Sequence, residues 1–202
     1  MQIMKSNLIG VVVLAAGASR RLGKAKQTLE FRHQTLLRRS AETALRVSRQ
    51  VVVTLGARSE IVRWEIEDLP LSIAENKDWE KGMGGSVKVG LERLLENSAD
   101  LRDAIIMVCD QPFVSADLLE KIIAEYQKTN ATIVACEYEN ISGVPALFSA
   151  KLFPELLALE PSEGAKTLIK KYCAETVSVP FPERAFDIDT PADYERLVKK
   201  FG

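Results

Sequence analysis

Residues 12–29 read VVLAAGASRRLGKAKQTL, and this stretch joins a buried strand to a charged loop. The aliphatic run over residues 8–15 predicts a strand that is apolar on both faces, as in a parallel sheet. The following loop holds Gly17 and Gly23, which let the backbone approach phosphate oxygens closely and aim N–H groups at them. It also carries four cations: Arg20, Arg21, Lys24 and Lys26. Because Arg and Lys neutralise phosphate charge, the stretch predicts a triphosphate site at the end of a strand.

Two common phosphate-binding motifs are absent from this loop. The P-loop places four residues between its glycines and then Lys and Ser or Thr. Here five residues separate Gly17 from Gly23, and Ala25 follows Lys24. The dinucleotide fingerprint G-x-G-x-x-G also fails, because residues 18–22 contain no glycine. The loop is therefore a nucleotide site of a third kind, or a solvated loop whose cations occur by chance.

Outward from this loop, strand-like and helix-like segments alternate along the chain. Apolar runs predict strands over residues 8–15, 50–55, 71–74, 104–108, 131–136, 145–149 and 176–179. Apolar residues at helical spacing predict helices over residues 36–47, 59–67, 86–95, 115–126, 150–158, 164–172 and 191–200. This alternation predicts one domain over residues 1–202, a three-layer α/β/α Rossmann-like fold with a mostly parallel, mixed sheet. Ligands of such sheets bind beyond the carboxyl ends of the strands.

The composition is that of an ordinary globular protein, with 202 residues of which 47% are hydrophobic. A net charge of −1, from 27 cations and 28 anions, argues against broad electrostatic capture of nucleic acid. Three widely spaced cysteines predict reduced thiols in a cytoplasmic protein rather than a disulfide framework. The single histidine, His33, excludes a histidine-rich metal site and is expected in a surface turn. No apolar run suits a signal sequence or a transmembrane helix, so no membrane association is expected.

Acidic residues stand where a ligand of this fold would bind. Asp110 follows the fourth predicted strand, where its carboxylate can hold Mg²⁺, a hard cation that takes carboxylates together with phosphate oxygens. Asp187 and Asp189 project to the same side if their segment is extended, and two close carboxylates resist joint ionisation unless a cation compensates. Each position has an alternative. Asp110 can belong to a turn, and Asp189 or Thr190 can cap the last helix.

Residues 14–26, LAAGASRRLGKAK, resemble the signature L-A-[AG]-G-x-S-x-R-M-G-x-x-K of the MobA-like nucleotidyltransferases. The Ala-Ala-Gly form, followed by Ser19, is most similar to the molybdenum cofactor cytidylyltransferase branch of that family. Two departures are mild, because Leu22 replaces Met and Ala25 replaces a common Pro. The resemblance continues through five later blocks and implies a nucleotidyltransferase fold of the GT-A-like type.

Two of the later blocks resemble the metal-binding segments of the family. Residues 110–112, DQP, resemble the block D-x-P, which implies that Asp110 is a metal ligand. Residues 186–191, FDIDTP, resemble the block D-x-[DN]-x-P, which implies that Asp189 is the second ligand. By this analogy the metal site consists of Asp110 and Asp189, with Asp187 in support.

The remaining three blocks resemble segments that contact the base or the acceptor in the family. Residues 81–87, KGMGGSV, resemble the segment that lies against base and ribose, and imply nucleotide contacts by Gly82, Gly84 and Ser86. Residues 143–148, GVPALF, and residues 163–166, EGAK, resemble acceptor-side blocks. They imply acceptor contacts by three residues: Gly143, Pro145 and Lys166. Two departures leave the base and the acceptor open, since Gly85 replaces the usual Ser and Val144 a frequent His. For each block, a surface turn before a helix is the alternative.

Together the blocks imply a Mg²⁺-dependent nucleotidyltransferase that moves CMP from CTP to the phosphate of molybdopterin and releases pyrophosphate. Arg21 would hold the β- and γ-phosphates, and Lys26 the charge that grows on the α-phosphate. The implied nucleotide-binding residues of the loop are Leu14, Ala15, Ala16, Gly17 and Ser19, together with Arg21 and Lys26. A molybdoenzyme or its chaperone is an implied partner. Two alternatives stay open: transfer to a sugar phosphate or another small phosphorylated acceptor, and a non-catalytic nucleotide-binding accessory protein. CTP and GTP are not distinguished.

Overall fold

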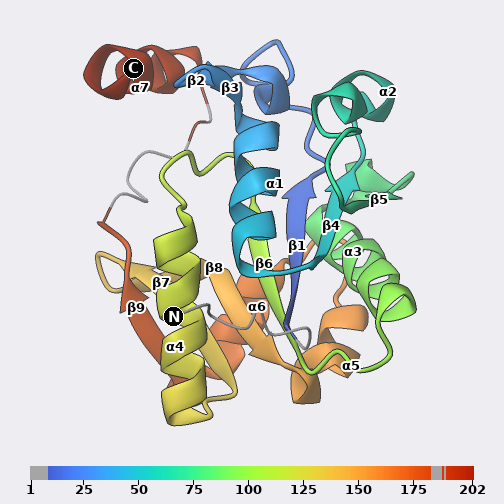
Figure 1. The fold of residues 1–202 in the computed structure, drawn as a ribbon, viewed down its shortest axis with the longest axis vertical. Coiled ribbons are helices and arrows are strands. Elements are labelled where there is room, and N and C mark those ends of the chain that lie inside the picture. Colours follow the sequence, from blue (N-terminus) through green and yellow to red (C-terminus); the bar gives the residue numbers. More distant parts are fainter. Residues whose placement is uncertain (1–8, 183–187, 189) are drawn as a thin grey trace.

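The computed structural model describes residues 9–182, 188 and 190–202. One seven-stranded sheet has the order β5-β4-β1-β6-β8-β7-β9 (Figure 1). The strands are β1 (Ile9–Ala15), β4 (Gln50–Leu55), β5 (Ser72–Glu75), β6 (Asp103–Val108), β7 (Ile133–Tyr138), β8 (Ile141–Ser149) and β9 (Thr176–Pro180). β8 runs antiparallel to β6 and β7, and the other neighbouring pairs in this sheet are parallel. The predicted α/β fold with a mostly parallel, mixed sheet is confirmed.

Helices cover both faces of the sheet (Figure 1). On one face, α1 (Leu36–Val47) and α4 (Ala116–Thr129) share a core with Val11 and Val13 of β1. On the other face, Val12 packs in a core with three helices: α3 (Met83–Asn97), α5 (Phe153–Leu157) and α6 (Ala165–Lys171). Successive side chains of a strand point to opposite faces, so a strand buried on both sides needs an uninterrupted apolar run. In the part of the chain that the structure describes, no helix has the length and apolarity needed to cross a bilayer.

A third hydrophobic cluster lies where β2 (Glu30–Phe31) and β3 (Gln34–Thr35) form a short hairpin that the sequence analysis does not predict. Figure 1 shows the last helix, α7 (Pro191–Phe201), beside this hairpin. Phe31 of the hairpin and Leu197 of α7 belong to the same cluster, and His33 lies exposed in the hairpin turn as expected. Thr190 caps α7, because its side chain accepts the N–H of Asp193 while the Asp193 carboxylate accepts the N–H of Thr190.

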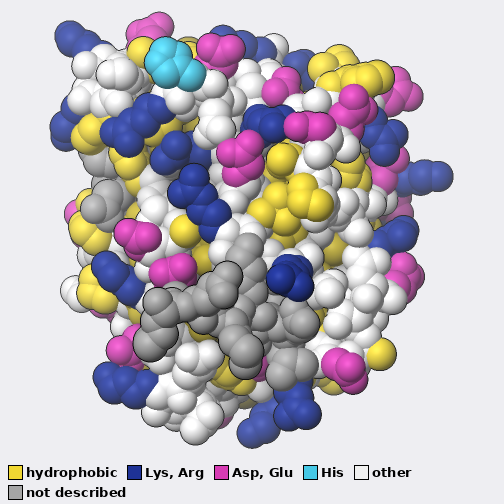
Figure 2. Space-filling view, in the orientation of Figure 1, with side chains coloured by type: hydrophobic (Ala, Val, Ile, Leu, Met, Phe, Trp, Pro, Cys, Tyr) yellow, Lys and Arg dark blue, Asp and Glu magenta, His cyan; other side chains and the backbone are white. Residues whose placement is uncertain are grey.

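The predicted helix over residues 59–67 is wrong in extent. α2 (Ser59–Val62) is a single turn, and a 3₁₀ turn over Arg63–Glu65 follows it. Its apolar residues do not share one buried side, since Ile61 is 62% and Trp64 68% exposed while Ile66 is buried. Figure 2 shows hydrophobic side chains at the surface over α2. An apolar face that is not covered by the core adds little stability to a helix.

The boundaries of α3 and β8 also differ from the prediction. α3 begins at Met83 rather than at residue 86, so part of the glycine block lies inside the first turn of the helix. β8 begins at Ile141 rather than at residue 145, because an irregularity of register accommodates Pro145 within the strand. Ala135 pairs with Ala146 whereas Cys136 pairs with Gly143, so Val144 and Pro145 stand outside the regular ladder. A residue without an N–H is tolerated at such a bulge.

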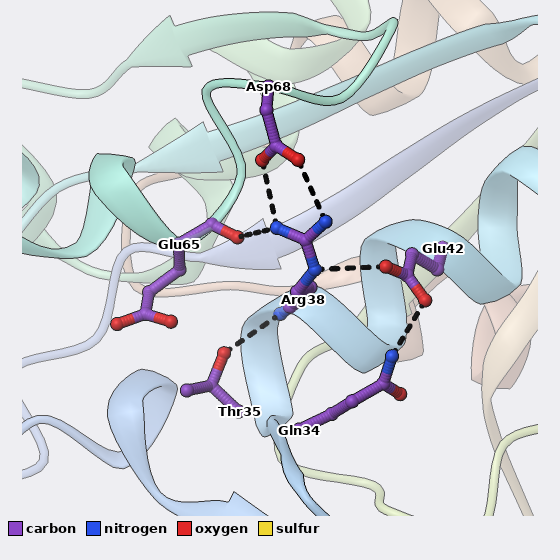
Figure 3. Close-up of polar contacts among 6 residues, drawn as sticks. All are labelled: Gln34, Thr35, Arg38, Glu42, Glu65 and Asp68. Carbon is purple, nitrogen blue, oxygen red and sulfur yellow. Dashed lines mark hydrogen bonds and ion pairs between the residues drawn. The ribbon is translucent and has the colours of Figure 1, made fainter.

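Arg38 connects the first turn of α1 to the segment before β5 (Figure 3). Its guanidinium donates two hydrogen bonds of 2.8 Å to the Asp68 carboxylate and one of 2.9 Å to Glu42. It also donates to the carbonyl of Glu65 at 3.2 Å. The hydrogen bonds to Asp68 raise the pKa of Arg38 above its ordinary value. This bidentate pair fixes the position of α1 beside the sheet edge.

Candidate active site

A cavity of about 380 Å³ opens at the carboxyl ends of β1 and β6. One wall is the loop after β1, and the opposite wall is the first turn of α3 with the segment before it. The lining residues are Leu14, Ala15, Ala16, Gly17, Ala18, Ser19, Arg20, Lys26, Gln27, Trp79, Glu80, Gly82, Met83, Ser86, Val108, Cys109 and Asp110. The fold therefore brings together the predicted loop residues, Lys26, Asp110 and three residues of the glycine block: Gly82, Met83 and Ser86.

Lys26 and Asp110 form an ion pair within this cavity. The Nζ atom of Lys26 lies 2.8 Å from Oδ2 of Asp110, and the two side chains are 14% and 25% exposed. Partial burial reduces the screening of these charges by solvent. A cation and a carboxylate are thus held side by side at the edge where ligands of this fold bind.

The loop after β1 folds back onto Lys26. Ser19 has a φ of +53°, and its Oγ accepts the backbone N–H of Lys26 at 3.0 Å. The N–H of Leu22 donates to the carbonyl of Ser19 at 2.9 Å, and the Leu22 side chain is buried in the hydrophobic cluster of the hairpin and α7. Gly23 has a φ of +74°, a conformation that favours glycine. The loop is therefore closed by its own contacts and anchored by an apolar side chain.

Asn76 does not line the cavity but supports Ser86, which does, and the sequence analysis did not predict this role. It is 3% exposed, its Nδ2 donates to Ser86 Oγ at 3.0 Å, and its Oδ1 accepts the N–H of Asp78 at 3.0 Å. A Cβ added at Gly85 would lie 3.2 Å from Asn76 Nδ2, so the glycine leaves room for this amide. The sequence contained a signal for this residue. Asn76 directly follows the parallel strand β5, just as Asp110 lies shortly after β6.

Gly82 and Gly84 of the block over residues 81–87 have a packing role in addition to any contact with a ligand. Gly82 lines the cavity with a φ of +132°, and a Cβ there would lie 2.1 Å from the carbonyl oxygen of Pro161. Gly84 lies outside the lining, its N–H donates to that same carbonyl, and a Cβ would lie 2.1 Å from the carbonyl oxygen of Glu160. Both glycines allow the first turn of α3 to approach the segment before α6.

Several predicted residues lie apart from this cavity. Arg21 is exposed and does not line it, and Gly143 and Pro145 lie on β8. Lys166 lines a second cavity of about 520 Å³, which also contacts Lys170 of the same helix and residues of β7, β8 and β9. The predicted acceptor residues therefore do not line the cavity that holds Lys26 and Asp110.

Of the three predicted aspartates of the metal site, Asp110 lies among the described residues. Asp187 and Asp189 lie outside the described residues. Ile188, which stands between them in the sequence, donates its N–H to the carbonyl of Asp110 at 3.3 Å. Among the described residues no three His, Cys, Asp or Glu side chains cluster as metal ligands. Asp110 fits Mg²⁺ or Mn²⁺ nonetheless, because such ions take one or two carboxylates and complete their shell with phosphate oxygens and water.

Cys109 lines the cavity, but its side chain is buried. Burial raises its pKa to about 12, and the neighbouring charge of Asp110 contributes to the increase. A neutral thiol is a poor nucleophile and a poor metal ligand. All three cysteines are free, as the sequence analysis predicts.

The cavity combines a parallel strand that opens into a glycine-containing cationic loop with a carboxylate near the end of the neighbouring strand, an arrangement suited to a nucleoside triphosphate. The chain belongs to the family of the MobA-like NTP transferase domain, whose model matches residues 11–177. The resemblance seen in residues 14–26 is thereby confirmed.

Curated relatives carry different names. The chain is 30% identical to the purine catabolism protein PucB of Bacillus subtilis, over 96% of this chain and 98% of that protein. It is 28% identical to nicotine blue oxidoreductase of Paenarthrobacter nicotinovorans, over 93% and 95%. It is 24% identical to the molybdenum cofactor cytidylyltransferase of Escherichia coli, over 92% and 93%.

Solved structures show the same fold over nearly the whole chain. An Rv0371c homologue from Mycobacterium sp. strain JC1 has a TM-score of 0.81 and 32% identity, with 96% of this chain and 97% of that chain covered. A manganese complex of Rv0371c from Mycobacterium tuberculosis has a TM-score of 0.75 and 28% identity, with 95% and 98% covered.

Proposed function

We propose that this protein is a single-domain cytidylyltransferase of the cytoplasm that moves CMP from CTP to the phosphate of molybdopterin. An oxygen of the acceptor phosphate forms a bond to the α-phosphorus of CTP. The bond from that phosphorus to the oxygen bridging to the β-phosphate breaks, and pyrophosphate leaves with the electron pair. The observation that carries this proposal is the pairing of Lys26 with Asp110 in the cavity at the strand ends.

Lys26 stabilises the negative charge that grows on the α-phosphate, as a preorganised cation in a partly shielded site. Backbone N–H groups of residues 16–19 bind the phosphates and the base edge, and Gly82, Gly84 and Ser86 lie on the base side. Arg21, which stands in the same loop but outside the cavity lining, is the proposed contact for the β- and γ-phosphates. Transfer of a phosphoryl-type group depends on positioning and charge neutralisation, so no histidine or other strong base is required.

Asp110, together with Asp189, is the proposed ligand set for Mg²⁺. When bound, the metal neutralises phosphate oxygens and acts as a Lewis acid. The manganese complex of the mycobacterial structure supports a divalent ion in this fold, and Asp110 supplies the hard oxygen ligand that such ions prefer.

The proposal also covers the acceptor-binding residues and the protein that receives the product. Gly143, Pro145 and Lys166 are proposed acceptor contacts, and a molybdoenzyme or its chaperone is the proposed recipient of the product. The relative from Escherichia coli supports CTP and the molybdenum cofactor by its name. Two further relatives, from Methanosarcina mazei and Pelotomaculum thermopropionicum, are named probable molybdenum cofactor guanylyltransferases, so GTP belongs in every assay.

The test is release of pyrophosphate by the purified protein with Mg²⁺ or Mn²⁺, molybdenum cofactor and each of CTP, GTP, ATP and UTP. Release that requires both CTP and the cofactor is the expected result. Release with another phosphorylated acceptor would retain the reaction and overturn the substrate. If no pair releases pyrophosphate but triphosphate binds, the transferase proposal is wrong and a binding role replaces it. Oxidation of NADH or NADPH, measured in parallel because of the relative named an oxidoreductase, would also contradict transfer.

A further inference from the structure

The two members of the ion pair share a feature in the sequence: each is followed by a buried glutamine. Gln27 follows Lys26 and is 1% exposed, and Gln111 follows Asp110 and is 4% exposed. Glutamine is mostly found at protein surfaces, and burial of an amide is unfavourable unless its polar atoms are paired. Both amides therefore need an explanation at this position in the site.

Gln27 bridges the two ends of the phosphate loop. Its Nε2 donates one hydrogen bond of 2.7 Å to the carbonyl of Ala15 and another of 2.9 Å to the carbonyl of Gly17. Ala15 ends β1, and Gly17 belongs to the loop whose N–H groups are proposed to meet phosphate. Since Gln27 is covalently next to Lys26, its amide fixes the distance between that cation and the loop.

Gln111 makes a similar connection on the other side of the ion pair. Its Nε2 donates to the carbonyl of Val144 at 3.3 Å. Val144 lies in the irregular part of β8, where the ladder leaves two residues unpaired. The amide therefore joins the segment of Asp110 to the strand that carries the proposed acceptor contacts, Gly143 and Pro145.

Stability alone does not account for these two amides. Among the described residues, neither Oε1 atom has a hydrogen-bond partner although both atoms are buried. An unpaired buried acceptor is destabilising, so each amide combines a donor that binds main-chain carbonyls with an oxygen that lowers stability. Natural sites retain such unfavourable groups where a specific arrangement is needed for function.

We propose that Gln27 and Gln111 are positioning residues of the transfer reaction, with separate tasks. Gln27 holds the triphosphate loop against Lys26, and Gln111 holds Asp110 against the acceptor strand β8. The inference rests on the proposed function, and it assigns each substrate to one of the two glutamines.

The test compares Gln27→Met and Gln111→Met in the full-length protein, with the exposed Gln127→Met of α4 as the control. Methionine has a similar length and no donor. For Gln27→Met we expect the KM of the triphosphate to rise about tenfold or more while the KM of the acceptor is unchanged, the scale of a misplaced reacting group. For Gln111→Met we expect the reverse, and kcat falls in both variants. A purely structural role predicts a lower kcat with both KM values unchanged, and that result would overturn the proposal.

Gln27→Glu gives a second readout if the methionine variant folds poorly. Its protonated carboxyl can still donate to one of the two carbonyls, whereas the ionised form repels both. We expect a new ionisation in the pH profile of kcat/KM, with activity lost as the pH rises. A pH profile parallel to that of the parent would count against a positioning role.

Calorimetric titration with CTP and Mg²⁺ separates failure of this inference from failure of the proposed function. Parent protein that binds CTP but transfers nothing refutes the proposed transfer. Even then, about tenfold weaker binding by Gln27→Met but not by Gln111→Met supports the loop role of Gln27, while equal binding by all variants rejects it.

Discussion

The Nζ atom of Lys26 lies 2.8 Å from Oδ2 of Asp110, although the two residues are 84 positions apart in the sequence. They meet because β1 and β6 are parallel neighbours whose carboxyl ends reach the same edge of the sheet. Ser19 holds the backbone of Lys26, and the N–H of Ile188 binds the backbone of Asp110. Loss of the Lys26 charge removes this cation from beside a carboxylate that is 25% exposed.

Replacement of Lys26 by Ala is expected to lower kcat by about 10²-fold or more, because a preorganised cation at the α-phosphate is lost. Pyrophosphate release under saturating substrates measures the effect. Lys24→Ala is the matched control, since Lys24 is exposed in the same loop and does not line the cavity. Near-parental turnover by Lys26→Ala would show that Lys26 has no part in the chemistry.

Replacement of Asp110 by Asn is expected to abolish most of the stimulation by Mg²⁺ or Mn²⁺, because an amide oxygen is a much weaker ligand for hard cations than a carboxylate. The measurement is turnover as a function of metal concentration, with circular dichroism to confirm folding. Asp100→Asn, in an exposed turn, controls for the loss of one negative charge. An unchanged metal response would remove Asp110 from the ligand set.

The three thiols are expected to differ in reactivity. At pH 8 an alkylating reagent should modify Cys173, which is exposed, and leave Cys109 and Cys136 intact. Cys109 is 4% exposed and burial raises its pKa to about 12, so almost none of it is thiolate at that pH. Mass spectrometry of the labelled protein identifies the sites, and all three should react in denaturant. Equal labelling of Cys109 and Cys173 in the native protein would contradict the structure.

Asp103 is expected to make stability depend on pH. Burial raises its pKa above the ordinary value of 3.8, although the hydroxyl of Tyr126 donates to it at 2.5 Å. The folded state therefore binds this proton more tightly than the unfolded state. The contribution of Asp103 to stability is most favourable below pH 3.8 and is lost as the pH rises through the folded pKa.

Asp103→Asn keeps an acceptor for Tyr126 and removes the charge. Its free energy of unfolding is expected to equal or exceed that of the parent at pH 7. The difference should shrink as the pH falls through the raised folded pKa of Asp103 and should be gone below pH 3.8. Denaturant unfolding at several pH values measures this. A variant that is less stable at pH 7 and recovers at low pH would show that the ionised carboxylate is favoured in the folded protein.

The architecture follows from local patterns that are visible in the chain. The aliphatic run over residues 8–15 is typical of a strand buried on both faces, and the alternation of such runs with amphipathic segments favours helices on both sides of a mostly parallel sheet. The predicted helix and strand boundaries are wrong where the local pattern and the tertiary packing disagree. Trp64 completes an apparent helical pattern but lies exposed, and Pro145 looks like the start of a strand but lies in a bulge.

The charged residues of the site could be predicted from the sequence for a similar reason. Asp110 closely follows β6, and Lys26 stands at the far end of the loop that follows β1. The carboxyl ends of parallel neighbouring strands meet at one edge of the sheet, so residues after them converge. Asn76 obeys the same rule and was overlooked because a lone amide after a strand resembles a turn residue.

The amino-acid order thus specifies which elements form and which edge of the sheet carries the chemistry, because both depend on periodicity and on the polarity of strand ends. It does not specify the hydrogen bonds of Gln27 and Gln111, or the separation of Lys166 from the pair of Lys26 and Asp110. Those features depend on the packing of segments far apart in the chain, where a shift of one residue in a loop changes which carbonyl an amide meets.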